Sequence, residues 1–153
     1  MKRVVQEQRL AFVATVCPDG TPNVSPKGTI AVWDDDHLVF ANIRSPGTMR
    51  NLKRNPIVEL NIVDPFARKG YRFRGEASVL ESGSVYDEVM ASYAARRSRV
   101  DVFRELVMVK VTKAEPLTSP AYELGRTEDE VRGQWKRHYQ SLGSGTTNAP
   151  DSE

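Results

Sequence analysis

The sequence predicts a mainly β protein in which six short antiparallel strands form a barrel or a sandwich, with helices at its flanks. Short apolar runs alternate with polar turn segments between residues 10 and 113, as expected for strands joined by tight turns. Two other segments place apolar side chains at helical spacing, and a third, residues 46–54, carries helix start and stop signals. The chain has 153 residues, which is the size of one ordinary domain.

The first two strands form a predicted hairpin. Residues 10–16 are almost continuously apolar, and Pro18-Asp19-Gly20-Thr21 supplies the residue types of a tight turn. Residues 22–33 should therefore return antiparallel to the first strand. Pro26 and Gly28 interrupt this second strand, and both residue types weaken a β-ladder, so a bend is expected there.

Four further strands are predicted beyond a polar break at Asp34-Asp35-Asp36. They cover residues 37–41, 57–63, 71–80 and 106–113. Each is short and each is bounded by turn or loop residues. With the hairpin they complete six strands, a pattern typical of an antiparallel barrel or sandwich.

Three helices are expected between and after these strands. Residues 46–54 should form two turns that end at Asn55-Pro56, because a residue before proline avoids the helical region. Residues 84–95 carry one apolar stripe, which should pack over an open end of the barrel. The last helix begins at the capping box Thr127-Glu128-Asp129-Glu130 and runs to about residue 142.

The predicted organisation is one domain, residues 1–142, followed by a flexible tail. Residues 143–153 are rich in Gly, Ser, Thr and Asn, and nothing in them is suited to packing. Apolar runs are too short to cross a bilayer, and no apolar segment of signal-peptide type follows the N-terminus. A cytoplasmic protein with no membrane partner is therefore expected.

Charge and composition argue against several classes of function. The chain has 22 basic and 20 acidic side chains, a balance that argues against a dedicated nucleic-acid-binding protein. One cysteine, Cys17, and two histidines are too few for a structural zinc site, and no carboxylate cluster suggests another metal. Locally, Arg44, Arg50, Lys53 and Arg54 have no acid among them. Their positive field suits a small anion.

The segment 42–51 predicts a phosphate site at a helix N-terminus. Ser45 is a suitable N-cap, and the proline after it fits the first helical position. The amides of Gly47 and Thr48 should then point out of the helix, a geometry that binds anions. Arg44 or Arg50 would add charge. The alternative is a capped connector helix with a solvated basic face.

Two other segments are open to a ligand-binding and a structural interpretation. The first is Val24-Ser25-Pro26-Lys27-Gly28-Thr29. It would bend where a planar ligand lies close to the backbone, or it would form an edge bulge with a solvent-exposed Lys27. In residues 68–75, Arg72 and Arg74 alternate with two aromatic residues. These arginines either face solvent or contact single-stranded nucleic acid, and the low net charge argues against the second.

Five segments stand in an informative order: the Pro-Asp-Gly turn, Val24-Ser25-Pro26-Lys27-Gly28, Leu38-Val39-Phe40-Ala41, Thr48-Met49-Arg50-Asn51-Leu52 followed by Asn55-Pro56-Ile57-Val58, and Arg72-Phe73-Arg74-Gly75-Glu76-Ala77. Their order and spacing resemble the pyridoxamine 5′-phosphate oxidase-like FMN-binding split-barrel family over about residues 8–115. Ser119-Pro120-Ala121-Tyr122 and the charged last helix are similar to the ending of a small bacterial branch. The resemblance implies a six-stranded antiparallel Greek-key split barrel with flanking helices, a homodimer, and FMN at each end of the dimer interface.

The resemblance also implies which residues bind the cofactor. Thr48 and Asn51 match the phosphate-contacting residues of the family's helix, and Lys27 lies on the strand that runs along the flavin. Lys69 and Arg72 match positions that often reach the flavin or its phosphate. The full predicted set is Ser25, Lys27, Gly28, Thr29, Ala41, Asn42, Arg44, Ser45, Thr48, Asn51, Lys69 and Arg72.

The function implied is that of an FMN-dependent oxidoreductase that transfers hydride between flavin and a small-molecule substrate. No catalytic residue is assigned, although Lys27, and after it Arg72, would suit stabilisation of reduced flavin. The alternatives are an F420-dependent reductase on the same fold and a non-catalytic flavin or haem carrier, the latter needing a histidine ligand. The family's vitamin B6 oxidases end in an arginine-x-histidine segment. Here only Arg137-His138 is present, so pyridoxamine phosphate oxidation is not implied.

Overall fold

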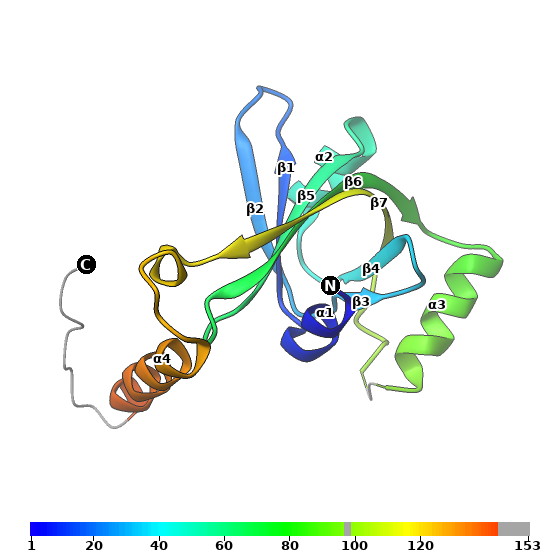
Figure 1. Ribbon diagram of the computed structural model, residues 1–153. Coiled ribbons are helices and arrows are strands. Elements are labelled where there is room, and N and C mark those ends of the chain that lie inside the picture. The colour runs from blue at the N-terminus through cyan, green and yellow to red at the C-terminus, as the bar shows by residue number, and fades with distance from the viewer. Residues whose placement is uncertain (97–98, 144–153) are drawn as a thin grey trace.

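The computed structural model, which describes residues 1–96 and 99–143, is one curled antiparallel sheet that forms a split barrel (Figure 1). The strand order is β2-β1-β5-β6-β7-β4-β3, so the barrel is open between β2 and β3. This confirms the predicted mainly β split barrel. The strands are β1 (Ala11–Val16), β2 (Pro22–Lys27), β3 (Ala31–Val32), β4 (His37–Asn42), β5 (Ile57–Asp64), β6 (Lys69–Leu80) and β7 (Glu105–Thr118).

The described residues form seven strands rather than the six expected, because the predicted strand 22–33 is divided. Its first part, β2, pairs with β1, and Ala31 and Val32 form β3, which pairs with β4 instead. Between the two parts, residues 28–30 leave the ladder at the interruption that Pro26 and Gly28 predict. The chain therefore crosses the barrel opening at this point, from one edge strand to the other.

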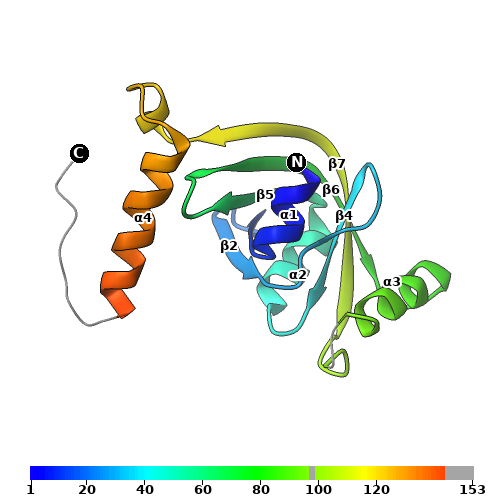
Figure 2. The same cartoon turned by 60° about the horizontal axis from the view of Figure 1, so that its bottom comes forward.

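Three helices lie beside the barrel, and the fourth, α4, stands away from it (Figures 1 and 2). Helix α2 has the predicted bounds, whereas α1 was not predicted because it is short and carries only a few apolar residues. Val5 of α1 is fully buried at the end of the barrel. The helices are α1 (Lys2–Gln8), α2 (Pro46–Arg54), α3 (Ser84–Ala94) and α4 (Glu128–Gly143), with a short 3-10 helix η1 (Pro120–Tyr122).

Helix α3 corrects one expectation about packing. Its stripe was expected to cover an open end of the barrel, but Val89 and Tyr93 pack with Val39 on β4 and with Leu106 on β7. Val39 and Leu106 belong to a cluster separate from the barrel interior, where the adjacent Phe40 and Val107 lie. Since alternate residues of a strand face opposite sides of the sheet, α3 covers the outer face of β4 and β7.

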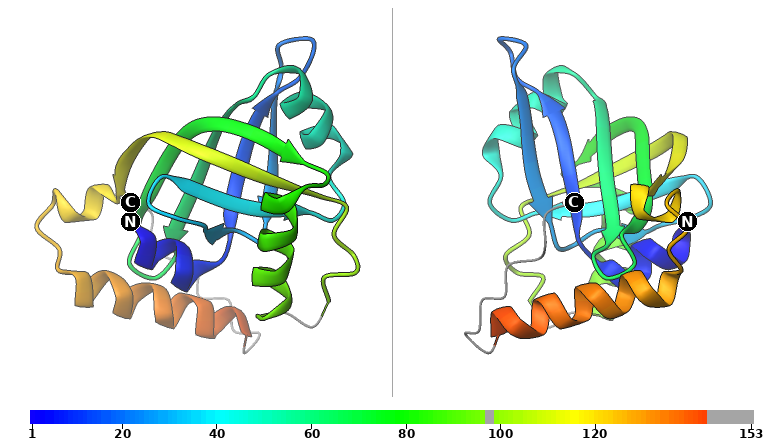
Figure 3. Two further views of the ribbon diagram at one scale, coloured as in Figure 1. Left: turned by 90° about the vertical axis from the view of Figure 1, so that its right-hand side faces the viewer. Right: turned by 60° about the vertical axis from the view of Figure 1, so that its left-hand side comes forward.

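Helix α4 lies apart from the barrel and contacts the tip of the β5–β6 hairpin (Figure 3). Its predicted capping box forms: the Thr127 amide donates to Glu130 Oε2 at 2.8 Å, and the Glu130 amide donates to Thr127 Oγ1 at 3.3 Å. The predicted flexible tail, apart from Gly143, lies outside the described residues. Within residues 1–96 and 99–143, no helix has the length and apolar character needed to cross a membrane.

Candidate functional site

Lys27, at the end of β2, is a buried lysine without a carboxylate partner. Only 4% of its surface is exposed. Its ammonium donates to Ser25 Oγ and to Ser45 Oγ, both at 2.6 Å, and no acidic side chain within the described ranges forms an ion pair with it. Burial lowers the pKa of Lys27 below its usual range. Burying a charge without an opposite charge costs free energy. An anion beside the Lys27 ammonium would supply that opposite charge.

The N-terminus of α2 lies beside that ammonium and lacks a side-chain cap. Ser45 occupies the predicted N-cap position, but its hydroxyl forms no capping hydrogen bond and accepts from Lys27 instead. Asn42 fixes the loop, because its Oδ1 accepts from the Ser45 amide at 2.9 Å. A Cβ built on Gly47 would meet nothing closer than 3.9 Å. The first-turn amides are thus left for a ligand, as an anion-binding helix requires.

Most of the predicted cofactor residues gather around one cavity of about 370 Å³, here called the Lys27 cavity. A Cβ built on Gly28 would meet no atom within 4 Å, so the cavity is open there. Pro26 and Ile43 also line it. A second cavity of about 360 Å³ lies beyond Ser45 and includes Asn42. The predicted residues that line the Lys27 cavity are Ser25, Lys27, Gly28, Thr29, Ala41, Arg44 and Ser45.

Thr48 and Asn51 lie beneath this surface in a buried polar network. Thr48 is 2% exposed, and its Oγ1 accepts from Asn23 Nδ2 at 3.3 Å. Asn51 donates to Thr15 Oγ1 at 3.0 Å, and Asn23 donates to the same oxygen at 3.1 Å. The network joins α2 to β1 and β2, and it holds the helix against the strands that carry Lys27.

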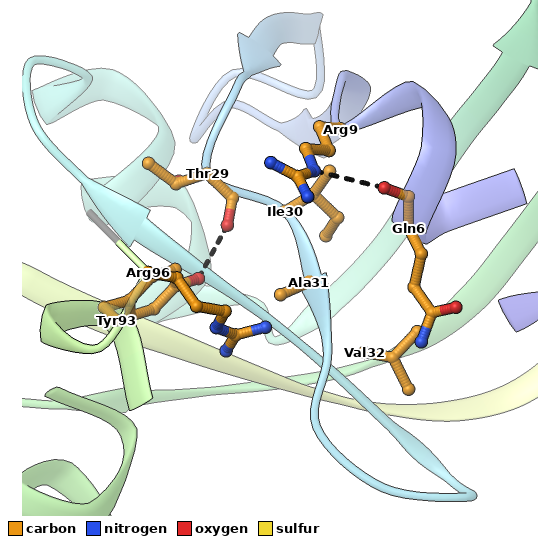
Figure 4. Close-up of a pocket in the computed structure, with 8 residues that line it drawn as sticks. All are labelled: Gln6, Arg9, Thr29, Ile30, Ala31, Val32, Tyr93 and Arg96. Carbon is orange, nitrogen blue, oxygen red and sulfur yellow. Dashed lines mark hydrogen bonds between the residues drawn. The ribbon is translucent and has the colours of Figure 1, made fainter. Parts of the chain in front are cut away.

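Thr29 is held rigidly by two neighbouring elements. Its hydroxyl accepts from the Ala41 amide at 2.9 Å and donates to the Ala41 carbonyl at 3.1 Å. Its own carbonyl accepts from Tyr93 Oη at 2.7 Å, beside a smaller cavity of about 90 Å³ (Figure 4). The guanidinium groups of Arg9 and Arg96 enter this smaller cavity from α1 and from the end of α3. Thr29 therefore fixes the segment that bridges the barrel opening.

Lys69 and Arg72 are not brought to the Lys27 cavity. Lys69 forms an ion pair with Glu128 at 2.9 Å and lies over the Tyr122 ring at 4.1 Å, near α4. The Glu128 carboxylate raises the pKa of Lys69. Arg72 lies on β6, 3.9 Å from a Glu59 oxygen. Within one chain, these two residues belong to a different part of the surface from the other predicted residues.

Sequence reasoning missed partners that are remote along the chain. Asn42 Nδ2 donates to Glu105 Oε2 at 2.6 Å, because Asn42 and Glu105 are paired in the β4–β7 register. Arg104 and Glu105 line the second cavity with Arg50 and Lys53. No local motif marks Arg104 or Glu105, and only knowledge of the strand pairing would have found them.

Comparison with known proteins identifies the family. The family model described as pyridoxamine 5′-phosphate oxidase matches residues 1–117. The chain belongs to this family. The match spans nearly the whole split barrel and every residue that lines the Lys27 cavity. No curated protein matches the sequence.

Solved structures of the same fold extend this comparison. HupZ of group A Streptococcus has 30% identity and a TM-score of 0.69, with 78% of this chain and 92% of that chain covered. An FMN-binding protein of Syntrophomonas wolfei has 17% identity and a TM-score of 0.64, covering 77% and 84%. HutZ of Vibrio cholerae, a haem storage protein, has 23% identity and a TM-score of 0.63, covering 76% and 90%. An F420 reductase also shares the fold. Proteins of this fold thus differ in the cofactor that they are named for.

Proposed function

We propose that the chain is an FMN-binding flavoprotein and an oxidoreductase that transfers hydride between flavin and a small molecule. The observation that carries this proposal is the buried Lys27 ammonium, which donates to the Ser25 and Ser45 hydroxyls and lies 5.9 Å from the centre of the Phe40 ring. It has no carboxylate partner among the described residues. It lies next to an uncapped helix N-terminus. A phosphate would supply the missing negative charge and would accept from the helix amides.

The residues present fit such a cofactor. The Lys27 cavity has an open backbone at Gly28, and Arg44 stands at its rim. Gly47 leaves room for close approach to the first turn of α2. Lys27 and the amides of α2 would hold the anionic part, while Arg44 and Arg50 would add positive charge. When bound, FMN accepts or donates hydride, and the protein supplies position and electrostatics.

The arrangement favours a phosphate-bearing cofactor over a haem. Haem iron is held by a side-chain ligand, commonly histidine. His37 bonds to Asp34 at 2.9 Å in an exposed turn, and His138 lies on α4 against the Trp135 ring. Neither histidine lines the Lys27 cavity. A redox role in this cavity would therefore come from a bound cofactor such as FMN, or from F420 as the second candidate, since F420 also carries phosphate.

We also propose that the protein is a homodimer whose partner subunit covers the Lys27 cavity. The outer side of β1, β2 and β5 exposes a group of apolar side chains, here called the apolar outer face. An apolar patch of this kind marks an interface, and Pro26 belongs both to β2 and to the cavity wall. The members of the face are Leu10, Phe12, Val16, Val24, Ile57 and Val63, each at least 37% exposed.

The test is the visible absorption spectrum of the purified protein, followed by reconstitution of wild type and variants with FMN, F420 and haem. Flavin bands in the wild type and their loss in Lys27→Met are expected. Lys113→Met is the matched control, because Lys113 is exposed and pairs with Glu115. A Soret band, or equal FMN affinity in both variants, would contradict the proposal. Steady oxidation of NAD(P)H would then distinguish an enzyme from a carrier.

A further inference from the structure

A further large cavity, separate from the two cavities beside Ser45, lies at the junction between the barrel and the C-terminal segment. It has a volume of about 460 Å³ and is bounded by the tip of the β5–β6 hairpin, the end of β7 and the start of α4. We call it the Trp135 cavity. It shares no lining residue with the Lys27 cavity. Its volume lies within the range of small-molecule sites, about 300–1,000 Å³.

Arg68 is fixed in this cavity in an unusual backbone conformation. Its φ is 53°, in the left-handed region that residues with a side chain seldom adopt. Its amide donates to the Asp64 carbonyl at 2.8 Å, and its carbonyl accepts from the Ser119 amide at 3.0 Å. This conformation places the guanidinium carbon 3.4 Å from the centre of the Trp135 ring. A rigid stack of a cation on an aromatic ring therefore forms one wall.

The guanidinium of Arg68 is incompletely satisfied. Its Nε is buried and has no hydrogen-bond partner in the part of the chain that the structure describes. A buried donor left without an acceptor is destabilising, the more so for a charged group. The stack on Trp135 therefore does not replace the hydrogen bonds that this side chain would make in water.

Arg126 adds a second positive charge to the same cavity. Its Nη1 donates to Gln134 Oε1 at 2.5 Å, which is a neutral partner. The nearby acids are engaged elsewhere: Asp64 pairs with Arg132 at 2.8 Å, and Glu128 pairs with Lys69 and Arg132. Within residues 1–96 and 99–143, neither Arg68 nor Arg126 has an ion-pair partner. Two cations thus share one cavity whose lining includes no carboxylate.

The rest of the lining is mixed, and its polar members are Thr118, Ser119 and Gln134. Val63, Leu117, Ala121 and Val131 complete the walls around the Trp135 ring. We infer that the Trp135 cavity binds an organic anion that carries a phosphate or carboxylate on a flat apolar body. The two guanidinium groups would bind the anionic head group, since a guanidinium matches both oxyanions in geometry. The ring and the aliphatic side chains would cover the flat body.

The test uses the full chain and the fluorescence of Trp135. The sequence has two tryptophans, so Trp33→Phe leaves Trp135 as the single reporter. Phenyl phosphate and benzoate are the organic probes, inorganic phosphate tests charge alone, and benzyl alcohol tests the ring alone. A saturable change with phenyl phosphate or benzoate is expected, with weaker binding of inorganic phosphate and no response to benzyl alcohol. The tighter of the two organic probes identifies the preferred head group.

Variants assign the binding to this cavity. Arg126→Gln should weaken phenyl phosphate binding about tenfold or more, the effect of losing one charge-assisted hydrogen bond. Among the described residues, the Arg126 side chain donates only to Gln134, so this variant keeps its fold even where Arg68→Gln does not. Lys136→Gln is the control, since Lys136 is an exposed cation on α4 that does not line the cavity.

Three results would overturn the inference. One is the absence of saturable binding by either organic probe. Another is an equal loss of affinity in Arg126→Gln and Lys136→Gln, which would indicate non-specific attraction to a basic surface. The third is loss of probe binding in Lys27→Met, which would place the probe in the Lys27 cavity. Failure of FMN binding leaves this test intact, because the two cavities share no residue.

Discussion

Two regions of the molecule differ in whether their charged side chains form ion pairs and in how much apolar surface they expose. Around β1, β2 and α2, the charge of Lys27 is buried against two hydroxyls and the Phe40 ring. The same region exposes apolar residues such as Phe12 and Val24, which are 51% and 60% exposed. Around the β5–β6 tip, Asp64 pairs with Arg132 and Lys69 with Glu128, while Phe66 packs edge-on against Tyr139 with ring centres 5.5 Å apart.

This difference indicates which region is expected to bind an anion and a second subunit. A buried ammonium and an exposed apolar face both cost free energy in an isolated chain, and a bound anion and a second subunit would remove both costs. The β5–β6 tip needs no partner to satisfy its ion pairs or its Phe66–Tyr139 contact, although Arg68 and Arg126 form no ion pair within the described residues. The first region should therefore respond to cofactor and partner, and the second chiefly to changes within the chain.

The largest effect is expected from Val24→Glu, on the apolar outer face. Val24 is exposed in the single chain, so the substitution leaves the fold intact, but a dimer would have to bury an unpaired carboxylate. Dissociation should become easier by about a hundredfold or more, and light scattering should show monomers. Leu124→Glu is the control, since Leu124 is 84% exposed and lies outside this face. A wild-type monomer, or a Val24→Glu dimer, would contradict the proposed interface.

The second-largest effect is expected from Lys27→Met. This substitution should weaken FMN binding but stabilise the flavin-free protein. Lys27→Met should raise the Tm of the flavin-free protein by about 2–4 °C, because it removes a buried charge. In the folded state the pKa of Lys27 lies below its ordinary value of 10.5. Between these two pKa values the unfolded chain binds more protons, so wild-type stability should rise with pH in this interval. Calorimetry across the alkaline range should show that rise in wild type and its loss in Lys27→Met.

A smaller effect on the same region is expected from Thr48→Val. The Thr48 oxygen already accepts from Asn23, which leaves its hydroxyl proton for a phosphate. Losing one hydrogen bond to a charged group should weaken FMN binding by about tenfold to a hundredfold, measured by flavin fluorescence titration. Thr15→Val removes the other oxygen of the network and should lower the Tm while FMN affinity stays the same. Equal affinity in wild type and Thr48→Val would place the phosphate elsewhere.

The fold could be predicted from the sequence where local turn and capping residues alone determine the structure. Gly20 adopts a φ of 85° in the first hairpin, as the Pro-Asp-Gly turn requires, and Thr127 with Glu130 caps α4 as expected. The division of residues 22–33 between two strands was not predictable in the same way. Proline and glycine mark a bend, but only the closure of the sheet decides that Ala31 pairs with Val39.

The candidate site was predictable where its residues are close in the sequence or matched by the family resemblance. Lys27 and Ser45 could be proposed because their segments carry recognisable turn and cap residues, and the structure places the two side chains 2.6 Å apart. Their burial, which makes the charge significant, depends on packing that no motif encodes. A cofactor role for Lys69 and Arg72 stays a prediction. Within one chain the structure pairs Lys69 with Glu128 of α4, which the family match over residues 1–117 does not include.

The smallest effect is expected from Arg132→Met at the β5–β6 tip. Arg132 pairs with Asp64 at 2.8 Å and with Glu128 at 2.9 Å, and about a third of its side chain is exposed. Burial acts to raise the pKa of Asp64, but the amides of Ala67 and Phe66, together with Arg132, lower it overall. A partly exposed pair of this kind contributes up to about 1 kcal/mol.

This contribution has a defined pH window. The folded-state pKa of Asp64 lies below its ordinary value of 3.8, so the stabilisation is present above that value and is lost as the pH falls through the folded-state pKa. Arg132→Met should therefore lower the Tm at neutral pH, with a difference from wild type that shrinks in acid. Trp135 fluorescence should report the loosening of α4, while FMN affinity stays the same because Arg132 lies outside the Lys27 cavity. Loss of flavin from this variant would show that the two regions are coupled, and the distinction between them would fail.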